Sequence, residues 1–263
     1  MDGTEYNLVR NNDGQSLHGG NKGLDRIVWN VDRVTDNEVA FSYMSPDGEE
    51  GYPGTVVFKV VYMLTSDNEL KITYNAVTDK PTVVNLSCHA FFNLKGAGNG
   101  TVDDHILTIN SSRITPVDSF LIPTGERVPV EGTPFDFRIP TAIGARLDQD
   151  NEQLRFGKGY DHNWIIDKKI EGVEQIASVY EPTLGRYMEV WSDQPGLQFY
   201  GGNFFNGKVK DKYGKPMRFR EAIALETQKF PDSPNHPDFP TTRLNPGEVY
   251  VHTCIYKFMT KNE

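Results

Sequence analysis

The sequence is poor in cysteine and has no long apolar run. Its 263 residues include only two cysteines, Cys88 and Cys254, and each lies in an apolar, strand-like run where a free thiol behaves as a small buried hydrophobe. We therefore expect no disulfide between them. The most apolar window, residues 56–64, is interrupted by Lys59 and falls well short of the roughly 20 residues that a membrane span needs. The composition thus predicts no membrane partner.

Positive charge is also scarce, which argues against a nucleic-acid partner. The chain carries 27 Lys and Arg against 36 Asp and Glu, and its formal net charge of −9 would repel a phosphate backbone. Residues 1–5 have neither the basic segment nor the apolar stretch of a secretory signal. We therefore expect a cytoplasmic protein, with a secreted or periplasmic full-length form as the open alternative.

Helical periodicity is weak throughout, and short strand-like runs take its place. Residues 55–63 and 70–78 are rich in β-branched and aromatic side chains and flank a turn at 65–68, the sequence form of an antiparallel hairpin. The best helical stretches, 142–147 and 152–154, are too short to cross a parallel sheet. Further strands are expected at residues 82–85, 106–110, 187–191, 197–200, 222–226 and 249–258. This pattern predicts an all-β fold, a large antiparallel β-sandwich or barrel with few short helices.

Turn residues are spread evenly along the chain. The 24 Gly and 16 Pro occur at short intervals, and no segment has the biased composition of a linker. There is no repeat of fixed period, which disfavours a propeller or a solenoid. We therefore expect a single domain over residues 1–263.

Four short motifs stand apart from this pattern of strands and turns. They are Leu17-His18-Gly19-Gly20, Cys88-His89-Ala90-Phe91-Phe92-Asn93-Leu94, Gly159-Tyr160-Asp161-His162 and Leu225-Glu226-Thr227-Gln228. Each alone is a weak signal, since a histidine beside glycines is usually a turn residue and a lone strand glutamate usually faces solvent. Their order along the chain is far more specific.

This ordered set resembles the galactose mutarotase (aldose 1-epimerase) family over essentially the whole chain. The likeness extends to residues 115–118, 133–137, 198–203 and 244–248. The resemblance implies the large β-sandwich of that family, sometimes called a supersandwich. It also implies an isomerase that interconverts the α and β anomers of free hexoses such as galactose and glucose, without a metal or a cofactor.

Anomerisation needs one base and one acid on opposite sides of a single C–O bond. A proton leaves the C1 hydroxyl while another reaches the ring oxygen, and C1–C2 rotates before the ring closes on its other face. By the resemblance, Glu226 is the base and His89 is the acid. His18 helps to hold the ring-oxygen side of the sugar, while Asp161 and Gln198 bind its hydroxyls. In the pH–rate profile, we expect the acidic limb to come from the carboxylate and the basic limb from an imidazole.

Other aromatic and histidine side chains are expected to have structural roles. Phe91, Phe92 and Tyr200 could form an apolar platform for the sugar, but aromatic residues in strands are more often part of the core. The histidines that receive no role are His105, His162 and His252. His236 is at most a residue of the rim.

Two features differ from the family pattern. Residues 86–88 read Leu-Ser-Cys where the family usually has a polar pair such as Thr-Asn before His89, which leaves open what supports this histidine. The chain also begins too late to contain the first strands of the family and their Gly-Arg-x-Ala-Asn-Arg motif, whose first arginine contacts the sugar. We therefore expect a domain truncated at its N-terminus, with exposed strand edges that self-associate or bind an N-terminal fragment.

Three other functions stay open at the level of sequence. A sugar-binding or regulatory module without catalysis would be compatible with the missing arginine. A hexose-6-phosphate epimerase would need a basic cluster for the phosphate, and none is visible in the sequence. A metal site of His18, His89, Asp161 and Glu226 is the third alternative, although anomerisation needs only proton transfer.

Overall fold

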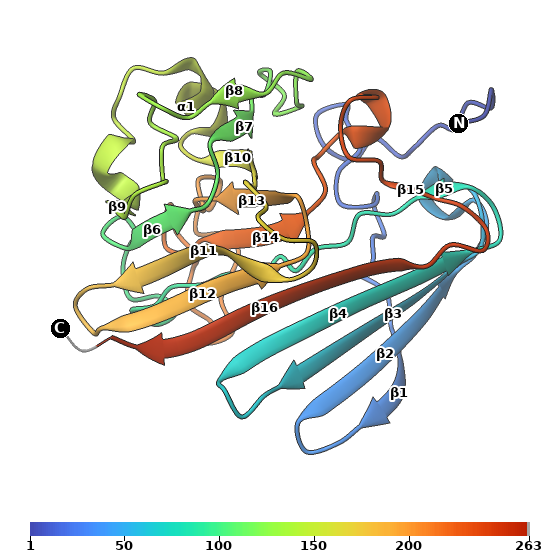
Figure 1. The fold of residues 1–263 in the computed structure, drawn as a ribbon, viewed down its shortest axis with the longest axis horizontal. Coiled ribbons are helices and arrows are strands. Elements are labelled where there is room, and N and C mark those ends of the chain that lie inside the picture. Colours follow the sequence, from blue (N-terminus) through green and yellow to red (C-terminus); the bar gives the residue numbers. More distant parts are fainter. Residues whose placement is uncertain (262–263) are drawn as a thin grey trace.

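Antiparallel strands dominate the computed structural model, which describes residues 1–261 (Figure 1). The large sheet has nine strands in the spatial order β1 (Asn30–Val34), β2 (Glu38–Ser45), β3 (Val56–Leu64), β4 (Glu69–Thr78), β16 (Tyr250–Thr260), β12 (Arg186–Ser192), β11 (Glu174–Glu181), β6 (Ile106–Ile109) and β9 (Thr141–Ala142). The small sheet has five, in the order β14 (Ala224–Gln228), β13 (Gly196–Tyr200), β10 (Asp161–Ile165), β7 (Arg113–Thr115) and β8 (Val128–Pro129). A separate pair joins β15 (Arg243–Leu244) to β5 (Thr82–Val83).

Helices are short in the part of the chain that the structure describes. The α-helix α1 (Glu152–Gly157) begins after Asn151, whose side chain accepts hydrogen bonds from the first turn, as an N-cap residue does. The 3-10 turns are η1 (Glu49–Gly51), η2 (Ile143–Arg146) and η3 (Ser233–Asn235). Among residues 1–261, no helix has the length and apolar character needed to span a membrane.

The predicted all-β class is confirmed, and so is the hairpin around residues 65–68. Strands β3 and β4 pair antiparallel from Val56 opposite Thr78 to Leu64 opposite Leu70. The sequence analysis did not predict β1, β2, β10 or β11, nor the short strands β7, β8, β9 and β15. Strand β10 shows no alternation because its three central residues, His162, Asn163 and Trp164, are all buried, while every residue of β1 is exposed, so β1 has no buried face to reveal it.

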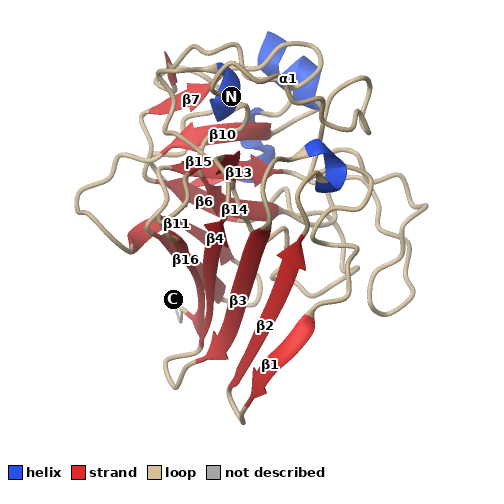
Figure 2. Ribbon diagram, turned by 90° about the vertical axis from the view of Figure 1, so that its right-hand side faces the viewer, coloured by secondary structure: helices blue, strands red, loops and turns tan. Residues whose placement is uncertain are grey.

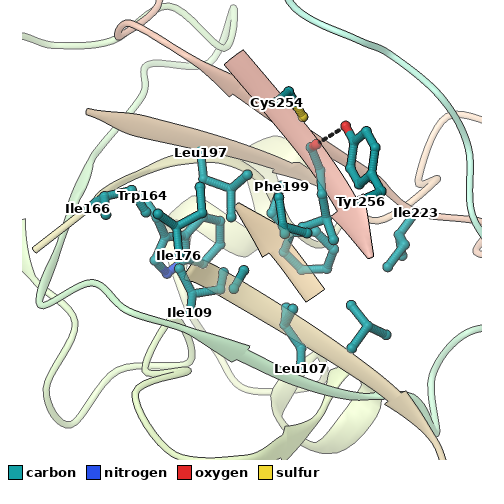
Figure 3. Packing of buried hydrophobic residues seen from close by; sticks show 14 of the residues in the cluster. Leu107, Ile109, Trp164, Ile166, Ile176, Leu197, Phe199, Ile223, Cys254 and Tyr256 are labelled. Atoms are coloured by element: carbon teal, nitrogen blue, oxygen red, sulfur yellow. Dashed lines mark hydrogen bonds between the residues drawn. The ribbon is translucent and has the colours of Figure 1, made fainter. Parts of the chain in front are cut away.

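The small sheet packs face to face on one part of the large sheet. Figure 3 shows Leu197 and Phe199 of β13 and Trp164 of β10 against Ile109 of β6 and Ile176 of β11, and all five side chains are at most 1% exposed. Burying each of them contributes roughly 1.5–3 kcal/mol, so this apolar contact holds the two sheets together. The outer face of the small sheet is left free to carry polar side chains.

Strands β1, β2 and β3 extend past the region covered by the small sheet (Figures 1 and 2). Strand β1 is the edge of the large sheet, and among residues 1–261 it pairs with β2 alone. Val31 and Val34 of β1 are 60% and 68% exposed, and Leu64 of β3 is 61% exposed. The large sheet thus ends in an open edge with apolar side chains in contact with solvent.

Both cysteines are free thiols, as the sequence analysis predicts. Cys254 of β16 is fully buried and Cys88 is half-buried. Burial raises the pKa of the Cys254 thiol to about 12, so it is neutral and acts as a small apolar side chain.

Candidate active site

Three of the five predicted site residues lie on the outer face of the small sheet. Gln198 of β13 stands directly opposite Glu226 of β14, and Asp161 of β10 stands opposite Tyr200. Directly opposed residues share a face, and so do alternate residues of one strand. These four side chains therefore project together, while their chain neighbours point into the core between the sheets.

His89 lies on an irregular segment that runs beside β14 and is tied at three points to β14 and the residues that flank it. The bonds are Asn85 Nδ2 to Lys229 O (2.9 Å), Lys229 N to Asn85 Oδ1 (2.9 Å), Ser87 Oγ to Thr227 O (3.0 Å), Phe92 N to Ile223 O (2.8 Å) and Ile223 N to Phe92 O (2.9 Å). Ser87 thus fixes the backbone two residues before His89. This contact answers the question that the sequence left open about the support of this histidine.

The structure brings the five predicted residues together. His89 Nε2 lies 3.5 Å from Glu226 Oε1. The rings of His18 and His89 meet edge to face, with their centroids 5.4 Å apart. On the other side, Gln198 Nε2 donates a hydrogen bond of 2.8 Å to Asp161 Oδ1. Gln198 Oε1 is buried without a partner among residues 1–261 and can accept a hydrogen bond from a ligand hydroxyl.

Aromatic rings border this cluster. Phe91 is 41% exposed, and its ring centroid lies 4.9 Å from that of His89 and 6.3 Å from that of Tyr200. Phe204, which the sequence analysis did not single out, is 43% exposed and its ring lies parallel to Tyr200 at 6.2 Å. The sequence feature that could have indicated Phe204 as a site residue is its position directly after the Gly-Gly-Asn turn at 201–203. The site therefore has an apolar rim beside its polar floor.

The remaining candidates have packing roles. Phe92 is half-buried and packs against the core, with its ring centroid 4.8 Å from that of Tyr256. Three histidines are fully buried, namely His105, His162 and His252. His236 is half-buried at the η3 turn, where its Nε2 lies 3.1 Å from Pro123 O.

Burial perturbs the carboxyl groups of the site. Glu226 is only 6% exposed, and this desolvation, with a smaller contribution from the Asp161 charge, raises its pKa to about 8. Burial also raises the pKa of Asp161 to about 6, against the opposing hydrogen bond from Gln198. Strongly perturbed carboxyl groups that share a site are typical of functional centres.

The pKa values of the two site imidazoles, His18 and His89, shift in the opposite direction. Partial burial lowers the pKa of His89 below its usual value of 6.5, and the neighbouring His18 adds to the effect. These directions place the pKa of the Glu226 carboxyl above that of the His89 imidazole. In the pH–rate profile the acidic limb should then come from His89 and the basic limb from Glu226, the reverse of the order expected from the sequence. Two groups 3.5 Å apart titrate as a pair, and between the two pKa values this pair holds one proton.

The arrangement of the site side chains does not match the alternative in which they bind a metal ion. Nowhere in residues 1–261 do three or more His, Cys, Asp or Glu side chains converge in a way that could hold a metal ion. The imidazole of His89 and the carboxyl of Glu226 instead form one close pair flanked by hydrogen-bonding groups.

An imidazole 3.5 Å from a buried carboxyl group, on a polar floor with an aromatic rim, is an arrangement that can bind a polar ligand and transfer protons. Comparison with known proteins identifies the family. The profile of the aldose 1-epimerase family matches residues 1–257, and the chain belongs to this family.

Similar proteins come from animals and bacteria. The chain is 44% identical over 258 residues to the galactose mutarotase of Bos taurus, covering 98% of this chain and 73% of the relative. It is 37% identical to the aldose 1-epimerase of Escherichia coli strain K12, covering 99% of this chain and 75% of that protein. The crystal structure of an aldose epimerase homologue from C. elegans matches with a TM-score of 0.90 at 29% identity, covering 100% of this chain and 78% of the other.

The influence of Asp161 on Glu226 generates the first prediction. The variant Asp161→Asn keeps an oxygen that accepts from Gln198 but removes the negative charge, so the pKa of Glu226 should fall below about 8. Carboxyl ¹³C NMR of protein labelled at glutamate measures this pKa. Asp167→Asn, which removes a carboxylate outside the site, should leave it unchanged. A Glu226 pKa that stays constant or rises in Asp161→Asn would contradict the assignment.

Proposed function

We propose that this chain is an isomerase, an aldose 1-epimerase that interconverts the α and β anomers of free hexoses such as galactose and glucose. The observation that carries the proposal is the buried carboxyl of Glu226, 3.5 Å from the imidazole of His89, on a face that also presents Asp161 and Gln198. Relatives that cover nearly the whole chain are galactose mutarotases and an aldose 1-epimerase.

The proposed mechanism moves two protons in each direction. Glu226 takes the proton of the C1 hydroxyl, His89 gives a proton to the ring oxygen, and the C1–O5 bond breaks to leave the open-chain aldehyde. Rotation about C1–C2 turns the other face of the carbonyl to the C5 hydroxyl. During ring closure His89 takes back its proton and Glu226 returns its own to O1. The site therefore ends in its starting protonation state, and the reaction consumes no cofactor.

The remaining groups orient the sugar in this proposal. Asp161 accepts hydrogen bonds from sugar hydroxyls, and the free Oε1 of Gln198 accepts another. His18 stands on the far side of His89 and holds the ring-oxygen side of the substrate. A site built to hydrogen-bond hydroxyls strongly disfavours analogues that lack them, because its buried polar groups are then left unpaired.

Polarimetry tests the proposed function. The protein should accelerate the mutarotation of freshly dissolved α-D-galactose and α-D-glucose, and both Glu226→Gln and His89→Asn should reduce kcat at least roughly 100-fold, the scale expected for a general base or acid. The matched control is Glu189→Gln, which changes a carboxylate on the outer face of β12. A wild-type protein that binds sugar without accelerating mutarotation would instead identify a binding module.

We further propose that residues 1–263 form one domain and that it self-associates. Residues of the central core come from both sheets and from segments spread along the chain, which supports one cooperative unit. The open edge at β1 has unpaired backbone groups and exposed apolar side chains, a combination that favours pairing with a second strand. The proposed partner is the β1 edge of a second copy.

Light scattering with a surface variant tests this proposal. Wild type should be larger than a monomer at micromolar concentration, and Val31→Lys should shift it toward the monomer, because a charge at an edge strand opposes strand addition. Val209→Lys is the matched control, since Val209 is also 60% exposed but lies in a loop outside both sheets. A monomeric wild-type protein would overturn self-association, and binding of an added N-terminal fragment would show that the edge accepts a different strand.

A further inference from the structure

The loop that presents His18 is closed by one backbone hydrogen bond of its own, from Gly20 N to Leu17 O at 3.1 Å. It contains no helix or strand, and three consecutive residues, His18, Gly19 and Gly20, have positive φ angles of 53°, 81° and 100°. For a residue with a side chain, such as His18, this conformation is uncommon and persists only when surrounding contacts enforce it. With a single backbone bond across this turn, the position of the His18 ring depends also on the side chains that hold the loop.

Asn11 fixes the loop on one side. Its Oδ1 accepts a hydrogen bond of 2.8 Å from Leu17 N, and its Nδ2 donates to Leu17 O and to Gly20 O, each at 2.9 Å. These bonds bracket His18, because they hold the residue before it and the residue two positions after it. A single side chain thus satisfies three backbone groups of the turn.

Glu50 fixes the loop on the other side. Its carboxylate accepts hydrogen bonds from Asn21 N at 2.9 Å and from Lys22 N at 3.0 Å, although it lies 29 and 28 residues further along the chain. A Cβ atom on Gly20 would stand only 2.2 Å from Glu50 Oε2, so glycine at this position permits the close approach. Hydrogen bonds to a charged acceptor are roughly twice as strong as neutral ones. Asn11 thus holds the first part of the turn, at residues 17 and 20, and Glu50 holds the residues that follow it, Asn21 and Lys22.

We propose that Asn11 and Glu50 are positioning residues that hold the His18 ring against His89 in the active site. The proposal rests on the proposed function for the role of His18, and it adds two residues that do not themselves face the acid–base pair. The His18 ring meets its neighbour only across an edge-to-face contact of 5.4 Å, so a loosened loop would move it away from the substrate.

A double-mutant cycle on kcat/KM tests whether Glu50 acts through His18. Glu50→Ala should lower kcat/KM by about 10- to 100-fold, the scale of an ångström-sized displacement in a site. In a His18→Ala background the same change should cost less than about twofold, because residues that act through one another are not additive. Asn11→Ala should behave in the same way. Equal losses in the two backgrounds would overturn the proposal.

Matched neighbours and a conservative variant separate positioning from general stability. Glu49→Ala removes the adjacent carboxylate, which accepts from the Tyr43 hydroxyl and does not touch the loop, and it should leave kcat/KM within about twofold. Asn12→Ala is the corresponding control for Asn11. Glu50→Gln keeps one acceptor oxygen and should recover part of the activity lost in Glu50→Ala. A Gln variant as inactive as the Ala variant would contradict the hydrogen-bonding role.

A spectroscopic measurement makes the test independent of activity. The imidazole ¹⁵N signals of His18 should shift and broaden in Glu50→Ala and Asn11→Ala, while those of the buried His252 stay in place. Unchanged His18 signals would overturn the positioning role even if activity fell. An inactive wild-type protein whose His18 signals still respond to Glu50→Ala would instead refute the proposed function and leave the positioning contact intact.

Discussion

The apolar contact between the two sheets is the constraint on which the candidate active site depends. Side chains such as Phe199 and Leu225 point into that contact, so the strand pleat forces Gln198 and Glu226 onto the opposite face. Register then decides which polar groups meet. A shift of one residue in β14 would move Glu226 into the core and dismantle the pair with His89.

Burial of Glu226 then determines the chemistry. The same desolvation that raises the pKa of Glu226 to about 8 favours the state in which the carboxyl holds the proton and His89 is neutral. In the proposed mechanism this is the state reached when the sugar ring has opened. The state that begins ring opening, with Glu226 ionised and His89 protonated, is therefore the minor arrangement of the one-proton pair, and burial lowers the free energy of the ring-opened state relative to it. The nearby imidazole of His18 and carboxyl of Asp161 adjust this balance further.

The sequence predicted the elements whose signal is local. The hairpin at residues 65–68 and the alternating run that forms β4 were recognisable because one face of each strand is buried. The ordered motifs also indicated the candidate site residues, and the structure brings these residues together. The proposed roles of those residues remain predictions.

Features that depend on distant parts of the chain could not be predicted. The pKa order of Glu226 and His89 depends on how deeply β14 is buried, which no local pattern reveals. The Glu50 carboxylate accepts hydrogen bonds from backbone groups of the His18 loop that lie almost thirty residues earlier in the chain. Backbone donors have no sequence signature. Strand β1 escaped notice because all of its residues are exposed.

The pH dependence of kcat/KM tests the central claim, that Glu226 and His89 share one proton. Below the pKa of His89 both groups are protonated and no base is left, while above the pKa of Glu226, about 8, both are deprotonated and no acid is left. The account therefore predicts a bell-shaped profile with its acidic limb below the usual imidazole pKa and its basic limb near pH 8. Activity that keeps rising with pH above about 8 would show that Glu226 acts as a base without a protonated partner, and would contradict the account.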